Sequence, residues 1–259
     1  MKLPIYQIDA FANELYKGNP AAVVPLKEWL PVSVMQNIAL ENNLSETAFF
    51  VNDKGYYHIR WFTPAVEVPL CGHATLASSF VIFNFLEENI KEIKFMSKSG
   101  ELIVTRHKNL ITLNFPSKKP LPIIAPQNLL NAIPVEPKEV LFNTSLLAVF
   151  DNEEIVREMK PNMSALAELK EDGLIITAPG KKYDFVSRYF VPNAGIDEDP
   201  VTGYAHTILT PYWSERLSKQ KLKAYQASKR GGEVFVENLG DRVKISGYAI
   251  LYLKGEIEL

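Results

Sequence analysis

The sequence predicts an α+β protein built from two similar halves, and three observations lead to this fold class. Short apolar stretches typical of β-strands occur along most of the chain, whereas few segments have a helical pattern. A strand, a glycine-centred turn and a helix follow one another twice, at Cys71–Ala74 and Thr202–Ala205. Prolines between Pro116 and Pro126 interrupt the chain between these steps. We therefore expect domains at 1–118 and 119–259, with a last strand that can return to the first half.

The expected strands are bounded by prolines, glycines or polar turns. His58 and Arg60, for example, alternate with apolar neighbours, which is typical of a strand with one buried face. Polar turns join two pairs of neighbouring strands into expected hairpins. The expected strands cover residues 3–9, 21–24, 46–51, 57–61, 102–106, 110–115, 234–236 and 243–253.

Three helices are expected, at 34–40, 74–85 and 205–217. The middle one has apolar residues on almost every side. A helix of this kind is buried all round, so we expect strands to surround it. The apolar residues that indicate this are Leu76, Ala77, Phe80, Val81, Ile82, Phe83 and Phe85.

Composition and charge indicate which classes of molecule this protein can bind. The 259 residues include 28 Lys plus Arg and 30 Asp plus Glu, so the net charge is −2 and gives no electrostatic case for nucleic acid or an anionic membrane. No apolar stretch approaches the roughly 20 residues that span a bilayer. Met1–Phe11 lacks the apolar run of a signal peptide, and the single cysteine, Cys71, cannot form an intramolecular disulfide. We expect a cytoplasmic protein with a small-molecule ligand, without nucleic-acid or membrane partners.

Acidic and histidine side chains lie near both glycine turns. Asp199 belongs to a run of three acids before the second helix, and helix capping is the plainer interpretation of each acid taken alone. In the first turn, Gly72 would let a ligand approach the backbone, and the helix would offer it free amides. His73 would then bind a substrate or pass a proton, although a capping or core-edge histidine is equally compatible with the sequence.

Other candidate chemistry is weaker. Glu46 is either a general acid/base at the lip of an apolar strand or a solvent-facing glutamate. Cys71 is interpreted as mostly structural, because sequence adjacency to His73 does not establish a catalytic dyad. The histidines lack metal-ligand spacing, and a site made of His73, His206 and Glu46 is a minor alternative, so we expect no metal. The sequence also lacks the nucleotide- and phosphate-binding motifs, which favours chemistry without a cofactor.

Eight motifs follow one another in order along nearly the whole chain. They are Asp9-Ala10-Phe11, Gly18-Asn19-Pro20-Ala21-Ala22-Val23, Leu44-Ser45-Glu46-Thr47-Ala48-Phe49, Arg60-Trp61-Phe62-Thr63-Pro64, Val68-Pro69-Leu70-Cys71-Gly72-His73-Ala74-Thr75, Ser187-Arg188-Tyr189-Phe190, Glu198-Asp199-Pro200-Val201-Thr202-Gly203, and Ser228 followed by Arg230-Gly231-Gly232. Through these motifs the chain resembles the PhzF-like (phenazine biosynthesis-like) isomerases. The resemblance implies a diaminopimelate-epimerase-like fold, in which strands wrap around a central helix in each half and the active site lies in the cleft between the halves.

The resemblance also implies residue roles. Epimerases of this fold use two cysteine thiols, and this chain has only one cysteine, so we expect a glutamate to take and return the proton instead. Glu46 matches that glutamate, and His73 and Asp199 match the accompanying polar residues. The implied substrate-binding positions are Asn19, Ser45, Gly72, Ala74, Gly203 and Tyr204.

Tyr204 departs from the family pattern, which usually has a serine at this step. If its phenol points toward the ligand, the substrate should be smaller or differently placed than in the phenazine enzymes. We therefore expect a cofactor-independent, homodimeric isomerase that shifts a proton within a small carboxylate-bearing substrate. The alternative is a catalytically silent small-molecule binding protein on the same scaffold.

Overall fold

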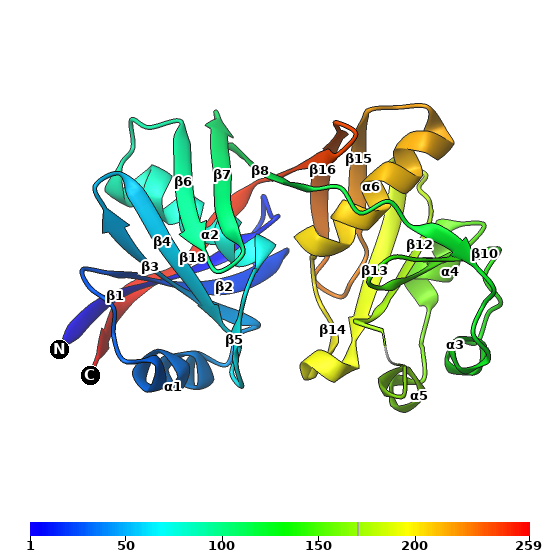
Figure 1. The fold of residues 1–259 in the computed structure, drawn as a ribbon, viewed down its shortest axis with the longest axis horizontal. Coiled ribbons are helices and arrows are strands. Elements are labelled where there is room, and N and C mark those ends of the chain that lie inside the picture. Colours follow the sequence, from blue (N-terminus) through cyan, green and yellow to red (C-terminus); the bar gives the residue numbers. More distant parts are fainter. Residues whose placement is uncertain (170) are drawn as a thin grey trace. The chain divides into compact units, whose positions relative to one another are not determined.

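The computed structural model describes residues 1–169 and 171–259, which form two compact units (Figure 1). Unit 1 comprises Met1–Phe115 and Ser246–Leu259, and unit 2 comprises Pro116–Ile245. Both units contain β-strands and few helices, which confirms the predicted α+β class. Among the helices of the described residues, none is long and apolar enough to cross a membrane.

Unit 1 is built on a mixed sheet. Strand β1 pairs antiparallel with β2 and with β18, and β2 pairs parallel with β3. Strand β4 pairs antiparallel with β3 and β5 and parallel with β6, after which β6, β7 and β8 form an antiparallel ribbon. The strands are β1 (Lys2–Ala10), β2 (Asn19–Leu26), β3 (Glu46–Asp53), β4 (Tyr56–Phe62), β5 (Glu67–Val68), β6 (Glu92–Ser97), β7 (Gly100–His107), β8 (Leu110–Pro116) and β18 (Ala249–Glu258).

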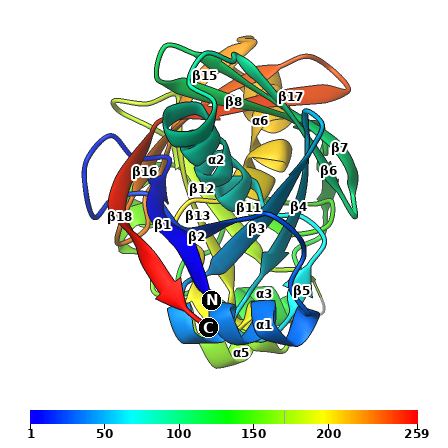
Figure 2. The ribbon, with the colours of Figure 1, turned by 90° about the vertical axis from the view of Figure 1, so that its left-hand side faces the viewer.

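Helix α2 (Gly72–Val81) is the buried helix that the sequence predicts. It contacts β1, β2, β3 and β18, and Figure 2 shows these strands around it. Its hydroxyl groups bond to the helix's own backbone, as in Ser78 Oγ to the carbonyl of Ala74 (2.8 Å), so they are buried without loss of hydrogen bonds. The helix continues as a π-helical turn, η1 (Ile82–Leu86), and α1 (Val32–Asn42) covers another part of the sheet.

Unit 2 has its own sheet and its own long helix, α6 (Gly203–Leu217), which contacts β15 and β16. Its core includes the inner faces of β10 to β13 and the short helices α3, α4 and α5. The remaining elements are β9 (Leu121–Ile123), α3 (Gln127–Ala132), β10 (Glu139–Phe142), β11 (Leu146–Val149), α4 (Glu153–Glu158), α5 (Met163–Ala167), β12 (Leu174–Pro179), β13 (Phe185–Val191), η2 (Pro192–Ala194), β14 (Ile196–Glu198), β15 (Lys221–Gln226), β16 (Gly232–Asn238) and β17 (Arg242–Gly247).

The strand pairing of unit 2 repeats that of unit 1. Strands β11 and β12 are parallel like β2 and β3, and β13 pairs antiparallel with β12 and β14 and parallel with β15, as β4 does with β3, β5 and β6. Strand β10 pairs with β9, as β1 pairs with β18. The glycine turns at Gly72 and Gly203 therefore begin equivalent helices, which supports the internal repeat that the sequence only suggests.

Three local predictions differ from the structure. The prediction of a single strand over 243–253 is wrong, because the β-structure is interrupted at Tyr248, between β17 and β18. At this break Gly247 lies against the ring of Phe11, where an added Cβ would lie 2.4 Å from Phe11 Cδ1. The expected elements did not include the short helices α3, α4 and α5 or the strands β5, β6 and β10 to β15, and the proline-rich stretch contains β9, which pairs with β10.

Candidate functional site

A tight turn at the end of β1 positions Asn19 at the start of β2. Gly18 has a φ of +68°, and an added Cβ would lie 2.1 Å from the carbonyl oxygen of Ala10, so only glycine fits this turn. Asp9 Oδ2 accepts a hydrogen bond from the backbone N–H of Tyr16 (3.1 Å) and stabilises the same turn. As a result, Asn19 is fully buried within hydrogen-bonding distance of α2.

Glu46 and His73, which the sequence predicts as catalytic, lie together in unit 1. Glu46 is the first residue of β3 and His73 the second residue of α2. The distance between Glu46 Oε2 and His73 Nε2 is 3.1 Å, and their side chains are 18% and 5% exposed. Neither atom makes a hydrogen bond of regular geometry within the described residues. The two groups are therefore held together by charge, and Glu46 is the more accessible of the two side chains.

The other ring nitrogen of His73 faces Asn19 and Cys71. Asn19 Nδ2 lies 3.2 Å and Cys71 Sγ 3.5 Å from His73 Nδ1. Burial alone lowers the pKa of His73, but Cys71 and Glu46 raise that pKa by more, to well above the ordinary value. Burial and the Glu46 carboxylate raise the pKa of Cys71 to about 11, so this sulfur stays a thiol at neutral pH.

Glu46, Cys71 and His73 are also three metal-ligating side chains whose donor atoms lie within 4.8 Å of one another. Their arrangement does not suit one ion as it stands. Glu46 approaches Nε2 of His73, whereas Cys71 approaches Nδ1, so the carboxylate and the thiol flank opposite nitrogens of the ring. A shared ion would require one of these side chains to turn, and the thiol to lose its proton.

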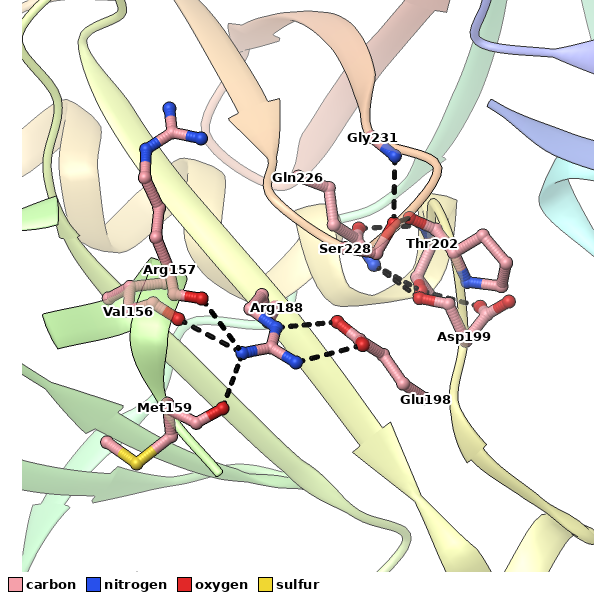
Figure 3. A network of polar contacts seen from close by, with 11 residues as sticks. Val156, Arg157, Met159, Arg188, Glu198, Asp199, Thr202, Gln226, Ser228 and Gly231 are labelled. Carbon is pink, nitrogen blue, oxygen red and sulfur yellow. Dashed lines mark hydrogen bonds and ion pairs between the residues drawn. The ribbon is translucent and has the colours of Figure 1, made fainter. Parts of the chain in front are cut away.

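Asp199, the third predicted catalytic residue, lies in unit 2 in the loop before α6. Its Oδ2 accepts a hydrogen bond from Thr202 Oγ1 (2.5 Å). The neighbouring Glu198 receives two hydrogen bonds from Arg188, at 2.7 and 3.0 Å. Arg188 also donates to backbone carbonyls at the end of α4, including that of Met159 at 2.7 Å (Figure 3). The loop that carries Asp199 is therefore fixed to the rest of unit 2.

His206 has the environment of a core residue. It is fully buried, and its Nδ1–H donates to the carbonyl of Thr202 at 2.7 Å. Burial lowers the pKa of His206 to about 4, so the ring is neutral. The metal-ligating group found among the described residues does not include it.

The structure also places the predicted substrate-binding residues. Gly72 and Gly203 are the first residues of α2 and α6, Ala74 is buried, and Ser45 directly precedes Glu46. The hydroxyl of Tyr204 hydrogen-bonds to Thr144 and lies 3.4 Å from Lys118 Nζ, so a ligand that used this hydroxyl would compete with both residues.

Two features of the site escaped the sequence reasoning. Gln226 of β15 bonds to the loop of Asp199, and nothing in its local sequence indicates this. The Arg60–Glu67 and Arg188–Glu198 pairs could have been predicted as equivalent features of the two halves. In each half the glutamate stands five residues before the glycine that begins α2 or α6.

Comparisons with known proteins show the family to which the chain is similar. A family model described as "Phenazine biosynthesis-like protein" matches residues 8–255. A Pseudomonas aeruginosa protein named an uncharacterized isomerase is 47% identical over 259 residues, which is all of both chains. The crystal structure of an Enterococcus faecalis protein of the PhzF family is 47% identical and covers all of both chains with a TM-score of 0.98.

A more distant structure identifies the fold class. A hydroxyproline epimerase from Agrobacterium vitis, only 9% identical, matches 99% of this chain and 92% of its own with a TM-score of 0.62. The fold is thus of the diaminopimelate epimerase and proline racemase type, as the sequence motifs imply. From its motifs, its fold and these relatives, the chain belongs to the phenazine biosynthesis-like family, the PhzF-like isomerases.

Proposed function

We propose that the protein is a cofactor-independent isomerase that shifts a proton within a small carboxylate-bearing substrate, with Glu46 as the general acid/base. The main support is the Glu46–His73 ion pair, which is largely buried and 3.1 Å long, without regular hydrogen bonds at the facing atoms. A carboxylate held in this way is available to a substrate C–H group. Relatives named isomerases are consistent with this class of reaction.

In the proposed step, Glu46 removes a proton from a substrate carbon, and the electrons of that C–H bond are delocalised into the adjacent unsaturated carboxylate system. Glu46 then returns the proton to another carbon on the same face, so nothing is oxidised or reduced. His73, whose Nε2 lies 3.1 Å from Glu46 Oε2, orients the Glu46 carboxylate before the proton is taken. The single cysteine argues against transfer between two thiols on opposite faces.

The proposed substrate carboxylate would bind to backbone amides at helix N-termini. Neither Cys71 of α2 nor Thr202 of α6 caps its helix with a side-chain hydrogen bond. Unsatisfied first-turn amides attract anions, and a carboxylate fits them in charge and size. Asp199 is proposed as an accompanying polar residue that binds or orients the substrate.

Solvent-deuterium exchange tests this function. The protein is incubated in D₂O with a panel of small unsaturated and amino carboxylates, and deuterium incorporation is followed by NMR and mass spectrometry. We expect incorporation with at least one compound, and its loss in Glu46→Gln with folding and ligand binding retained. Glu41→Gln, which makes the same change at an exposed position of α1, should exchange like the wild type.

Three outcomes would count against the proposal. Exchange that survives in Glu46→Gln removes Glu46 from the mechanism. Tight binding without exchange favours the catalytically silent binding protein, and loss of activity on chelation favours a metal. We also propose a homodimer in the cytoplasm, as the family resemblance implies, and a monomer in light scattering at micromolar concentration would contradict the oligomeric state.

A further inference from the structure

The hydroxyl of Thr202 has a hydrogen-bond partner that is unusual for a residue at the start of a helix. Thr202 is the N-cap residue of α6, where a threonine hydroxyl ordinarily accepts a hydrogen bond from an amide of the first helical turn. Here the side chain makes no such cap. Its Oγ1 lies 2.5 Å from Asp199 Oδ2 instead, although the whole residue is only 7% exposed.

Gln226 determines the direction of this hydrogen bond. The backbone N–H of Thr202 can only donate, so the Gln226 atom 2.8 Å from it is Oε1. The carbonyl of Asp199 can only accept, so the Gln226 atom 2.8 Å from it is Nε2. The two backbone partners thus fix the orientation of the amide, which is fully buried (Figure 3).

The fixed amide orients the hydroxyl in turn. Gln226 Nε2 also lies 3.1 Å from Thr202 Oγ1, and since this nitrogen can only donate, the hydroxyl oxygen accepts. The single hydroxyl proton then points to Asp199 Oδ2. The result is one directed chain, from the amide N–H of Gln226 through the hydroxyl of Thr202 to the carboxylate of Asp199.

Neighbouring contacts hold the backbone of the same loop. Ser228 Oγ donates to the carbonyl of Pro200 (2.7 Å) and accepts from the N–H of Gly231 (3.0 Å). His206 donates to the carbonyl of Thr202, and Asp199 N–H donates to the carbonyl of Tyr189 at 3.0 Å. The loop backbone therefore has supports of its own, and the Gln226–Thr202 chain continues from this backbone to the carboxylate.

We propose that Thr202 and Gln226 are positioning residues for the reaction, which set the orientation of the Asp199 carboxylate through the directed chain. The inference rests on the proposed function, in which Asp199 binds or orients the substrate. It adds two residues, one of them distant in sequence, that need not touch the substrate.

The test compares Thr202→Val, which is isosteric but lacks the hydroxyl, with Thr202→Ser, which keeps the hydroxyl. For a carboxylate that the wild type deuterates, we expect Thr202→Val to lower kcat about tenfold or more and to change KM by less than about threefold, because a hydrogen bond to a charged group is lost. Thr202→Ser should restore kcat to within about threefold of the wild type.

Two further variants separate positioning from general structural damage. Thr210→Val makes the same substitution inside α6, where the buried hydroxyl donates to the carbonyl of His206, and should leave kcat unchanged. Gln226→Met removes the orienting amide and should lower kcat less than Thr202→Val, because the hydroxyl can still turn to Asp199. Equal losses in Thr202→Val and Thr210→Val, or no rescue by Thr202→Ser, would overturn the proposal.

A measurement without substrate keeps the inference separate from the proposed function. In the wild-type protein, NMR should detect a slowly exchanging Thr202 hydroxyl proton, because a proton in a buried hydrogen bond is protected from solvent. The same proton should be present in Thr202→Ser and exchange faster in Gln226→Met. A Thr202 hydroxyl proton that exchanges freely in the wild type would refute the directed chain, even if Glu46 proves to be the base.

Discussion

Equivalent positions of the two units carry different chemistry. Glu46 starts β3 opposite Ala21, and the parallel pairing of β11 with β12 gives Leu174 the same place opposite Leu146. Asn19 and Thr144 each stand two residues before those partners. His73 and Tyr204 each follow the first glycine of the unit's long helix. Unit 2 thus has leucine, threonine and tyrosine where unit 1 has glutamate, asparagine and histidine.

The comparison shows how a duplicated fold becomes chemically one-sided. The Asn19–His73 contact has its counterpart in the Thr144–Tyr204 hydrogen bond, so a polar contact is kept while the imidazole is replaced by a phenol. Cys71 and Thr202 are the equivalent N-cap residues, and only the first is a thiol. At these equivalent positions only unit 1 carries a glutamate and a histidine, which fits proton transfer on a single face and the proposed isomerisation rather than a two-base epimerisation.

The largest expected effect comes from replacing His73 and its counterpart. His73→Gln removes the charged partner of Glu46 and should lower the rate of deuterium exchange about 100-fold or more. Tyr204→Phe removes only a hydroxyl that bonds to Thr144 and should lower the rate by less than about tenfold. Exchange rates of the two variants with the same carboxylate measure the difference. Similar losses in both would mean that the units share the chemistry.

The two arginine–glutamate pairs should differ in their contribution to stability. Arg188→Met leaves Glu198 without its partner and backbone carbonyls of α4 without a donor, so we expect a loss of about 3–5 kcal/mol in the free energy of unfolding. Arg60→Met should cost about 1–2 kcal/mol less, because Lys98 stays 2.7 Å from Glu67. Denaturant titration of both variants gives the two values. A larger loss for Arg60→Met would contradict the ranking.

The two buried histidines should respond to pH in opposite directions. Because burial lowers the folded-state pKa of His206 to about 4, its contribution to stability is complete above about pH 6.5 and is lost as the pH falls toward 4, by about 3 kcal/mol. The pKa of His73 is raised, so its contribution is present below about pH 6.5 and is lost as the pH rises through the raised pKa.

Two measurements check this contrast. NMR titration of the ring protons should show His206 neutral and His73 protonated at pH 6. Unfolding between pH 4 and 6.5 should depend less on pH in His206→Asn, whose amide can still donate to the carbonyl of Thr202. A wild-type His206 that titrates near its ordinary pKa would show that the two histidines are less different than their contacts indicate.

The smallest effect is expected at the N-cap thiol. Cys71→Ser makes this position resemble Thr202 and should change the deuterium exchange rate by less than about threefold, because the thiol, with a pKa raised to about 11, stays protonated at neutral pH and cannot accept a proton. The exchange assay with the same carboxylate measures this change. Abolished exchange in a folded Cys71→Ser protein would move the proton chemistry from Glu46 to sulfur.

Much of unit 1 could be predicted from local patterns. Glu46 stands where an apolar strand begins, and His73 follows a glycine that starts an apolar helix, so both lie at ends of elements that periodicity can locate. The burial of α2 followed from apolar residues on all its sides, and the structure confirms it. The interruption at Tyr248 was not predicted from local patterns; there Gly247 packs against Phe11, more than two hundred residues away in the sequence.

Unit 2 was harder to predict for the same reason. Its short helices have too few turns for a hydrophobic period, and their apolar residues are fixed by the core of β10 to β13. Capping was the plainer interpretation of the acids before α6, and the contacts of Asp199 with Thr202 and Gln226 are visible only in the tertiary structure.

The sequence by itself determined the α+β class and the buried helix through hydrophobic periodicity. It also determined the family through the order of its motifs, and the single thiol through the number of cysteines. The tertiary structure decided which ring nitrogen of His73 faces Glu46, that Leu174 occupies the equivalent place in unit 2, and that Gln226 directs the hydroxyl of Thr202. Strand pairing and side-chain rotamers bring such groups within 3 to 4 Å from distant parts of the chain. Local sequence patterns do not encode those distances.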